Sequence, residues 1–167
     1  MSKLLRYFAS GSTYFVTSVT SNRMPLLVEN AQFLQESITE TKKTSNFKII
    51  ARVIMPDHFH IIINPLENDL SIIMKKVKLR FSYRYRHLHK LYKGTLWQTR
   101  YWDHIIRNQD DMNRHIDYIH YNPVKHGLVK NPVIWPHSSI HEYVRAGIYT
   151  KDWGAQDMSF TNRDFGE

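Results

Sequence analysis

Hydrophobic and polar positions follow two periods along this chain, and together they predict an alternation of strands and helices. Segments rich in β-branched and aromatic residues predict four strands, at residues 13–19, 47–55, 58–64 and about 101–106. Apolar residues at helical spacing predict helices over 29–43 and 70–92, the second ended by Gly94. The order β-α-β-β-α-β predicts an α+β, ferredoxin-like fold, an antiparallel sheet with two helices packed on it and the third strand in its centre.

Another helix is predicted beyond the fourth strand. It begins at Asn108 or Gln109, has an acidic first turn, and runs until Pro123 and Gly127 stop it. Its predicted buried face consists of Met112, Ile116 and Ile119. Polar residues recur beside that face at i, i+4, i+7 and i+11, which places one polar stripe at the edge of the core: Asp111, His115, Tyr118 and Asn122.

Length and composition indicate one domain with a polyanionic partner. The 167 residues include 23 Lys and Arg against 15 Asp and Glu, a net charge of +8, and 13% aromatic residues, a balance that suits unpaired nucleic-acid bases better than lipid. There is no cysteine, so thiolate metal sites and disulfides are excluded. Without a signal or membrane-spanning segment, we expect a cytoplasmic, nucleoid-associated protein. Residues 1–153 form the predicted domain, and 154–167 a flexible tail that could cover the active site.

A His-x-His pattern opens the third predicted strand. Side chains at i and i+2 share a face of a strand, so His58 and His60 point the same way and Phe59 points into the opposite layer. Two imidazoles about 7 Å apart along a strand can bind one divalent cation. The alternative is a pair of hydrogen-bonded histidines in the core.

The second predicted helix and the segment after it are strongly basic. No Asp or Glu occurs from Leu70 to Tyr101, and Tyr83 and Trp97 lie among the cations. A run of one charge sign favours nucleic acid over a merely solvated helix face. The candidate DNA-binding residues are Lys75, Lys76, Lys78, Arg80, Arg84, Arg86 and Arg100.

Four motifs, in order, resemble one protein family over most of the chain, from about Arg6 to Trp153. They are MPDHFHIII, WQTRYWDHIIR, DYIHYNPVKHGLV and WPHSSIHEY. In this combination and spacing they are similar to the REP-associated tyrosine transposases, a group within the single-tyrosine HUH class of IS200-like transposases. The resemblance implies a ferredoxin-like domain, a Mg²⁺ or Mn²⁺ ion, and cleavage and rejoining of single-stranded DNA at palindromic hairpins.

The resemblance also implies residue roles. His58 and His60 match the family's metal ligands, and Tyr118 matches the nucleophile that forms a 5′-phosphotyrosine. Asn122 stands where relatives place an amide as third ligand, with His115 as the second choice. Tyr121 is a rival nucleophile, but it lies about 60° further round the helix, towards the buried face.

Other functions are compatible with parts of this pattern. A histidine-triad hydrolase is excluded, because Ile62 occupies the position of its third histidine. A single-stranded nucleic-acid-binding module of RRM-like fold would explain the charge and the strand order without chemistry. A metal-dependent nuclease that uses water would explain the histidines without a nucleophilic tyrosine. No nucleotide cofactor is expected, and monomer and homodimer both stay open.

Overall fold

The computed structural model describes residues 11–156, 158–159 and 165–166. The RYF segment at residues 6–8, where the family resemblance begins, lies outside the described residues. The predicted tail at 154–167 is described only in part, so its predicted flexibility stays a prediction.

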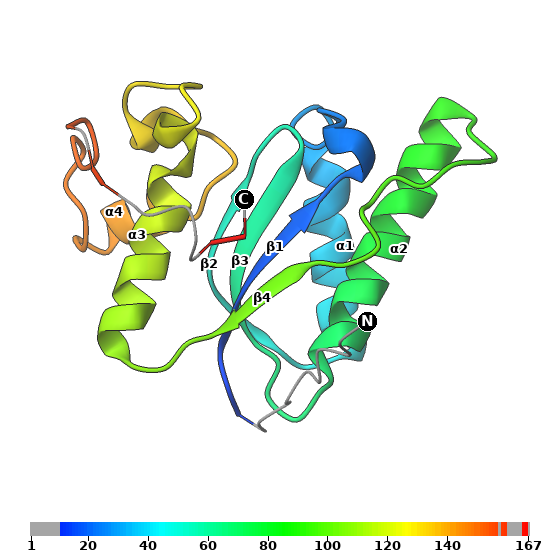
Figure 1. Ribbon diagram of the computed structural model, residues 1–167, viewed down its shortest axis with the longest axis horizontal. Coiled ribbons are helices and arrows are strands. Elements are labelled where there is room, and N and C mark those ends of the chain that lie inside the picture. The colour runs from blue at the N-terminus through cyan, green and yellow to red at the C-terminus, as the bar shows by residue number, and fades with distance from the viewer. Residues whose placement is uncertain (1–10, 157, 160–164, 167) are drawn as a thin grey trace.

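Four strands form one antiparallel sheet (Figure 1). They are β1 (Tyr14–Val19), β2 (Lys48–Ile54), β3 (His58–Asn64) and β4 (Trp102–Ile105). The sheet order is β2-β3-β1-β4, so β3 is central and pairs with both β1 and β2. The predicted strand order and the α+β, ferredoxin-like arrangement are confirmed.

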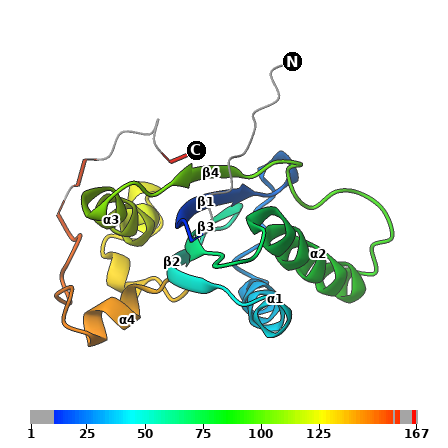
Figure 2. The same cartoon turned by 90° about the horizontal axis from the view of Figure 1, so that it is seen from below.

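Helices α1 (Ala31–Thr44) and α2 (Leu70–His89) cover one face of the sheet (Figure 2). Helix α1 begins later than predicted, because Asn30 is its N-cap residue and turns its amide back to the Leu26 carbonyl, 2.8 Å away. Helix α2 ends before Tyr92 and Gly94. Lys90 takes the left-handed conformation there (φ 53°), which ends the α-helical hydrogen bonding.

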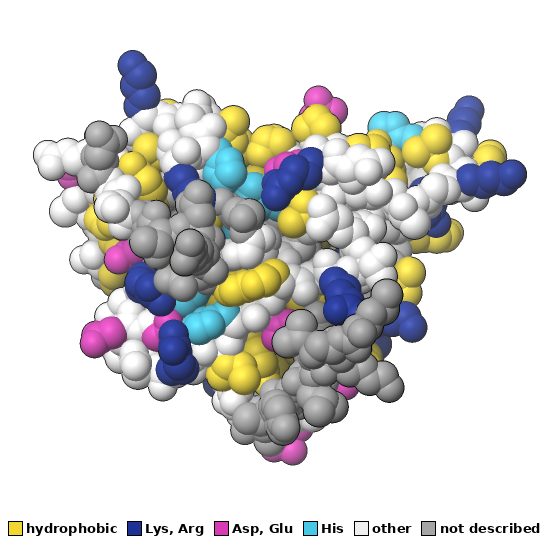
Figure 3. Space-filling model, viewed as in Figure 1, with side chains coloured by type: hydrophobic (Ala, Val, Ile, Leu, Met, Phe, Trp, Pro, Cys, Tyr) yellow, Lys and Arg dark blue, Asp and Glu magenta, His cyan; other side chains and the backbone are white. Residues whose placement is uncertain are grey.

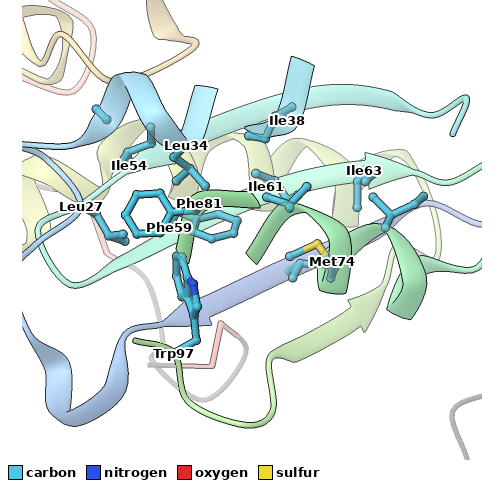
Figure 4. Packing of buried hydrophobic residues seen from close by; sticks show 14 of the residues in the cluster. Leu27, Leu34, Ile38, Ile54, Phe59, Ile61, Ile63, Met74, Phe81 and Trp97 are labelled. Atoms are coloured by element: carbon cyan, nitrogen blue, oxygen red, sulfur yellow. The ribbon is translucent and has the colours of Figure 1, made fainter. Parts of the chain in front are cut away.

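The larger core lies between this face and the two helices. Figure 4 shows Phe59 of β3 beside Leu34 of α1 and Phe81 of α2, with Ile61 and Ile63 following along the strand in the same cluster. The odd-numbered side chains of β3 therefore serve this layer, and the even-numbered ones face the other side of the sheet.

Helix α3 (Gln109–Lys125) covers that other side (Figure 2). Its first turn has the predicted cap, with the Asn108 side chain accepting the Asp111 N–H at 2.9 Å. The predicted end was right in part: α3 continues through Pro123, which does not stop it, and ends at Lys125, just before Gly127 at φ 68°.

The predicted burial of α3 was also partly wrong. Ile119 is buried, but Met112 and Ile116 are only half-buried. The predicted edge stripe is the buried face instead, with Asp111, His115, Tyr118 and Asn122 all buried. The sheet face below α3 is mixed: Phe15, Val53 and Ile62 pack with Tyr118 and Ile119, and the buried polar groups of Thr17, His58 and His60 lie beside them.

The chain after α3 closes the open edge of β2. It forms a 3₁₀ turn η2 (Pro132–Ile134) and helix α4 (Ile140–Arg145). Another 3₁₀ turn, η1 (Ser21–Arg23), follows β1. Ile54 N–H donates to the His137 carbonyl, and Ser139 N–H donates to the Arg52 carbonyl, each at 2.9 Å. Among the described residues, no helix has both the length and the hydrophobicity to cross a bilayer.

Candidate active site

The two histidines of β3 lie together beneath α3. His60 pairs with Thr17 and His58 with Val19 across the sheet, and both imidazoles are buried. Their ring centroids are 4.8 Å apart with planes at 74°. The strand alternation thus has both imidazoles on one face and Phe59 on the other. In the space-filling view, histidine side chains reach the surface between α3 and the sheet, next to Lys and Arg side chains (Figure 3).

Hydrogen bonds set the tautomer of each imidazole. Thr17 Oγ1 donates its proton to the Phe165 carbonyl at 2.8 Å, so it accepts from His60 Nδ1–H, also at 2.8 Å. His58 Nδ1 donates to Asp57 Oδ1 at 2.6 Å. In a neutral ring with its proton on Nδ1, the one in-plane lone pair is on Nε2, and this is the form in which imidazole binds a metal ion.

Asp57 is held as an anion beside His58. The hydrogen bond from His58 outweighs burial and lowers the pKa of Asp57 to about 2, and the charge of Arg23 acts in the same direction. Arg23 Nη1 lies 3.1 Å from Asp57 Oδ2. An ionised Asp57 fixes the His58 ring and increases its basicity at Nε2.

Helix α3 brings an amide and a phenol to the same place. Asn122 Oδ1 lies 3.4 Å from His58 Nε2, which is long for a hydrogen bond and ordinary for two neighbouring ligands of one ion. The Tyr118 ring packs edge-on against His60, with centroids 5.5 Å apart. Tyr118 and Asn122 are both 0% exposed. The structure therefore groups His58 and His60 with these two residues, one helical turn apart on α3.

Tyr121 occupies a different position. Its hydroxyl accepts the Met158 N–H at 3.2 Å, and its ring lies close to Gly154. Both tyrosines are buried, Tyr118 at 0% and Tyr121 at 5% exposure, so the predicted contrast in burial between them was wrong.

Two residues that sequence reasoning did not select contact Tyr118. Lys125 Nζ donates to the Tyr118 hydroxyl at 2.8 Å and lies 4.9 Å from the ring centroid. The Phe165 ring lies parallel to the Tyr118 ring, at 3.6 Å between centroids and 5° between planes. Lys125 could have been found from its i+7 spacing to Tyr118, had the helix been extended past Pro123. Phe165 has no such local signal.

His115 belongs to a second polar group, with His104 of β4 and Asp111. His104 Nε2 lies 2.8 Å from Asp111 Oδ2, and His115 Nδ1 donates to the Asp111 carbonyl at 2.7 Å. Burial opposes ionisation of Asp111, but hydrogen bonds from His104 and the Arg107 backbone outweigh it, and the pKa of Asp111 lies well below its usual range. Burial lowers the pKa of His115.

This group has the composition of a metal site, with possible ligand atoms within 4.8 Å of one another. Its rings do not have the orientation of one. The His104 and His115 rings are stacked at 4.7 Å with 14° between planes, so their in-plane lone pairs do not converge. His115 therefore joins α3 to β4 through Asp111 and His104, and is not grouped with His58 and His60.

The basic residues of α2 lie on the other side of the sheet and have two kinds of environment. Arg80 Nη1 pairs with Glu40 at 3.1 Å, and Arg84 Nε pairs with Glu36 at 3.3 Å, so these arginines join α2 to α1. The others have lighter contacts: Lys76 donates to Ser45 Oγ, Lys78 to the Gln98 carbonyl and Arg86 to the Gly94 carbonyl, while Lys75 and Arg100 are exposed.

A hollow of about 370 Å³ lies between α2 and the segment at 97–101. Its lining includes Lys75, Lys78, Trp97 and Tyr101. Cations beside aromatic rings suit a nucleic-acid strand with unstacked bases.

Comparison with known proteins places this geometry in context. Residues 9–122 match the family model described as "Transposase IS200 like". A REP-associated tyrosine transposase of Escherichia coli strain K12 is 36% identical over 164 residues, covering 96% of each chain. A relative from Haemophilus influenzae is 35% identical over 165 residues, covering 92% of this chain and 94% of its own.

A solved structure supports the same relationship. It is a REP-associated tyrosine transposase bound to a REP hairpin, with a TM-score of 0.86 and 37% identity, and the match covers 100% of this chain and 98% of that one. The similarity therefore extends over the whole fold, including both faces of the sheet.

Proposed function

The chain belongs to the IS200-like transposase family, and we propose that it cleaves and rejoins single-stranded DNA at REP-like hairpins through a tyrosine–DNA intermediate. One observation carries the proposal. His58 and His60 from β3 and Tyr118 and Asn122 from α3 meet in one buried group, although some sixty residues of sequence separate the pairs. A nucleophile beside two imidazoles and an amide oxygen is the set that phosphoryl transfer requires.

The donor set fits a divalent cation. His58 and His60 both use Nδ1–H in hydrogen bonds to Asp57 and Thr17, and Asn122 directs its oxygen towards His58 Nε2. We propose that His58, His60 and Asn122 hold Mg²⁺ or Mn²⁺, with that choice of ion taken from the family resemblance. Such an ion acts as a Lewis acid on a phosphate oxygen and orients the scissile group.

Tyr118 supplies the covalent chemistry. Its hydroxyl oxygen attacks the scissile phosphorus, a Tyr–O–P bond forms, the bond from phosphorus to the 3′ oxygen breaks, and the phenolic proton ends on the released 3′-hydroxyl. The product is a 5′-phosphotyrosine, whose bond energy is close to that of the phosphodiester it replaces. Attack by another 3′-hydroxyl reverses the step and rejoins the strand, so no nucleotide cofactor is required.

Hairpin DNA is the proposed substrate because of charge and similarity together. The net charge of +8 favours a polyanion, and the similar solved structure is bound to a REP hairpin. We assign the phosphate contacts to the basic stretch of α2 and its following segment, in particular Lys75, Lys78 and Arg100. The proposed site takes all its residues from one chain, so a monomer suffices for it and a homodimer is compatible with it.

Two alternative functions make different predictions about DNA cleavage and covalent attachment. A binding module of RRM-like fold would bind hairpins without cutting them. A water-using nuclease would cut without any covalent attachment to protein.

The deciding experiment is a denaturing gel of the protein with 5′- and 3′-end-labelled hairpin DNA, in Mg²⁺, Mn²⁺ or EDTA. We expect a metal-dependent adduct on the fragment 3′ of the cut, lost in Tyr118→Phe and retained in the matched control Tyr121→Phe. Hairpin affinity should persist in both variants. Binding without a cut would favour the RRM-like module, and a cut without an adduct would favour the water-using nuclease.

A further inference from the structure

The continuation of α3 through Pro123 places a lysine beside the proposed nucleophile. Proline is tolerated there with the loss of a single helical N–H donor, and the helix extends to Lys125. Seven residues correspond to about 700° of rotation, so Lys125 lies on nearly the same face as Tyr118. Had α3 ended at Pro123, Lys125 would not have been held on that face.

The contact has the geometry of a strong hydrogen bond. Lys125 Nζ lies 2.8 Å from Tyr118 Oη. An ammonium group has only donors, so the phenolic oxygen is the acceptor. Tyr118 is 0% exposed, and a hydrogen bond from a charged donor is stronger in such surroundings than in water.

We propose that Lys125 is a catalytic residue of the transposase reaction. Its ammonium group stabilises the negative charge that Tyr118 Oη carries once the phenolic proton has left and before the bond to phosphorus has formed, and the charge that builds again on this oxygen as it leaves during rejoining. Lys125 keeps its protons throughout, and the phenolic proton still ends on the 3′ oxygen. The inference rests on the proposed function, because it requires Tyr118 to be the nucleophile.

The alternative is a purely structural role, in which Lys125 only holds the Tyr118 ring in place. The Lys125 chain packs over the Tyr118 ring, with Nζ 4.9 Å from the centroid, and such packing alone would orient the ring. Methionine preserves an unbranched apolar chain but lacks the charge. Arginine preserves the charge. These two substitutions separate the roles.

The first measurement is single-turnover adduct formation at saturating hairpin and Mn²⁺. Lys125→Met should lower the rate on the order of 100-fold, the usual loss when one preorganised donor to a reacting oxygen is removed. Lys125→Arg should recover a large part of that loss, and hairpin affinity should stay unchanged in both. The matched control is Lys130→Met, an exposed lysine on the same segment, which should react like wild type.

The second measurement locates the charge that Lys125 serves. Incorporation of 3,5-difluorotyrosine at position 118 stabilises the phenolate by electron withdrawal, so it should shrink the penalty of Lys125→Met. A substrate with sulfur in place of the scissile 3′ oxygen makes the 3′ group a better leaving group. It should leave the rate loss caused by Lys125→Met unchanged.

The outcomes are separable. Equal rates for wild type and Lys125→Met, or rescue by the sulfur substrate instead of the fluorotyrosine, would overturn the role of Lys125 while leaving the tyrosine mechanism intact. A wild-type protein that cuts without an adduct would overturn both.

Discussion

Phe165 lies flat on Tyr118, with ring centroids 3.6 Å apart, and is itself 0% exposed. Its carbonyl accepts the Thr17 hydroxyl at 2.8 Å, and His115 packs against its ring at 5.0 Å between centroids. One face of the ring of the proposed nucleophile is therefore covered by a residue near the C-terminus.

We expect Phe165→Ala to accelerate adduct formation. Burial of a phenylalanine side chain is worth about 1.5–3 kcal/mol, and each 1.4 kcal/mol is a factor of ten, so the initial rate at subsaturating hairpin should rise roughly tenfold or more. The measurement is the initial rate of covalent adduct on a denaturing gel. Phe81→Ala, in the core on the other face of the sheet and also 0% exposed, is the control for a general loss of packing. An unchanged or lower rate in Phe165→Ala would contradict a covering role.

Thr17 orients His60 through the hydrogen bond to Nδ1, so its substitution tests the proposed metal ligands. Thr17→Val keeps the shape of the side chain but removes the acceptor for His60 Nδ1–H. Loss of such a partner typically weakens metal affinity 10- to 100-fold. The Mn²⁺ concentration for half-maximal cleavage should rise by this factor, with cleavage still attainable at saturating Mn²⁺.

The same strand offers a matched control for Thr17→Val. Ser18 points to the opposite face of the sheet, and its buried hydroxyl has no hydrogen-bond partner among the described residues. Ser18→Ala should leave the Mn²⁺ requirement unchanged. Thr17→Val also removes the hydrogen bond to the Phe165 carbonyl, which can change the maximal cleavage rate. The decisive quantity is therefore the Mn²⁺ concentration for half-maximal cleavage. A midpoint equal to that of wild type would remove His60 from the proposed ligand set.

The basic residues of α2 should separate into DNA-binding and structural groups. Lys75 is exposed and lines the hollow beside Trp97, so Lys75→Ala should weaken hairpin binding several-fold and reduce the slope of log affinity against log salt by about 0.7–0.9. Arg84 pairs with Glu36 and Glu40 of α1, so Arg84→Ala should lower the denaturation midpoint with little change in that slope. Fluorescence anisotropy over a salt series and urea unfolding measure the two quantities. If Arg84→Ala reduced the salt slope and Lys75→Ala only lowered the denaturation midpoint, the assignment of the DNA contact to Lys75 would be wrong.

The sequence predicts the fold well where the determinants are local. The bounds of β3 are as predicted, because the apolar run is framed by the Pro56-Asp57 turn and by Pro65. The order of elements around it is enough to specify the sheet topology. The end of α2 is harder to predict from sequence, because Lys90 takes the positive φ that ends the helix, where a glycine is usual.

The candidate site depends on contacts that no local pattern contains. Hydrophobic periodicity assigned Met112 and Ile116 to the buried face of α3, yet both are half-buried at the margin of the cluster that contains Tyr118 and Ile119. Phe165 meets Thr17 across 148 residues of sequence, and only the tertiary structure reveals this. Lys125 was missed because one proline was given too much weight as a helix terminator.

A buried histidine away from the proposed site should make the fold sensitive to acid. His120 of α3 is 0% exposed, and its Nε2 lies 2.8 Å from Ser139 Oγ. Burial lowers the pKa of His120 from 6.5 to about 3. Above pH 6.5 the imidazole is neutral in both states. As the pH falls from 6.5 towards 3, the unfolded chain takes up a proton that the folded chain does not, so this residue destabilises the fold by up to about 1.4 kcal/mol per pH unit.

The measurement is urea unfolding between pH 4.5 and 6. In His120→Asn the free energy of unfolding should fall less steeply with decreasing pH than in wild type, by up to about 1.4 kcal/mol per pH unit. Ser139→Ala disturbs the same contact but keeps the imidazole, so it should lower stability at every pH and retain the slope. An equal slope in wild type and His120→Asn would show that another group carries the acid sensitivity.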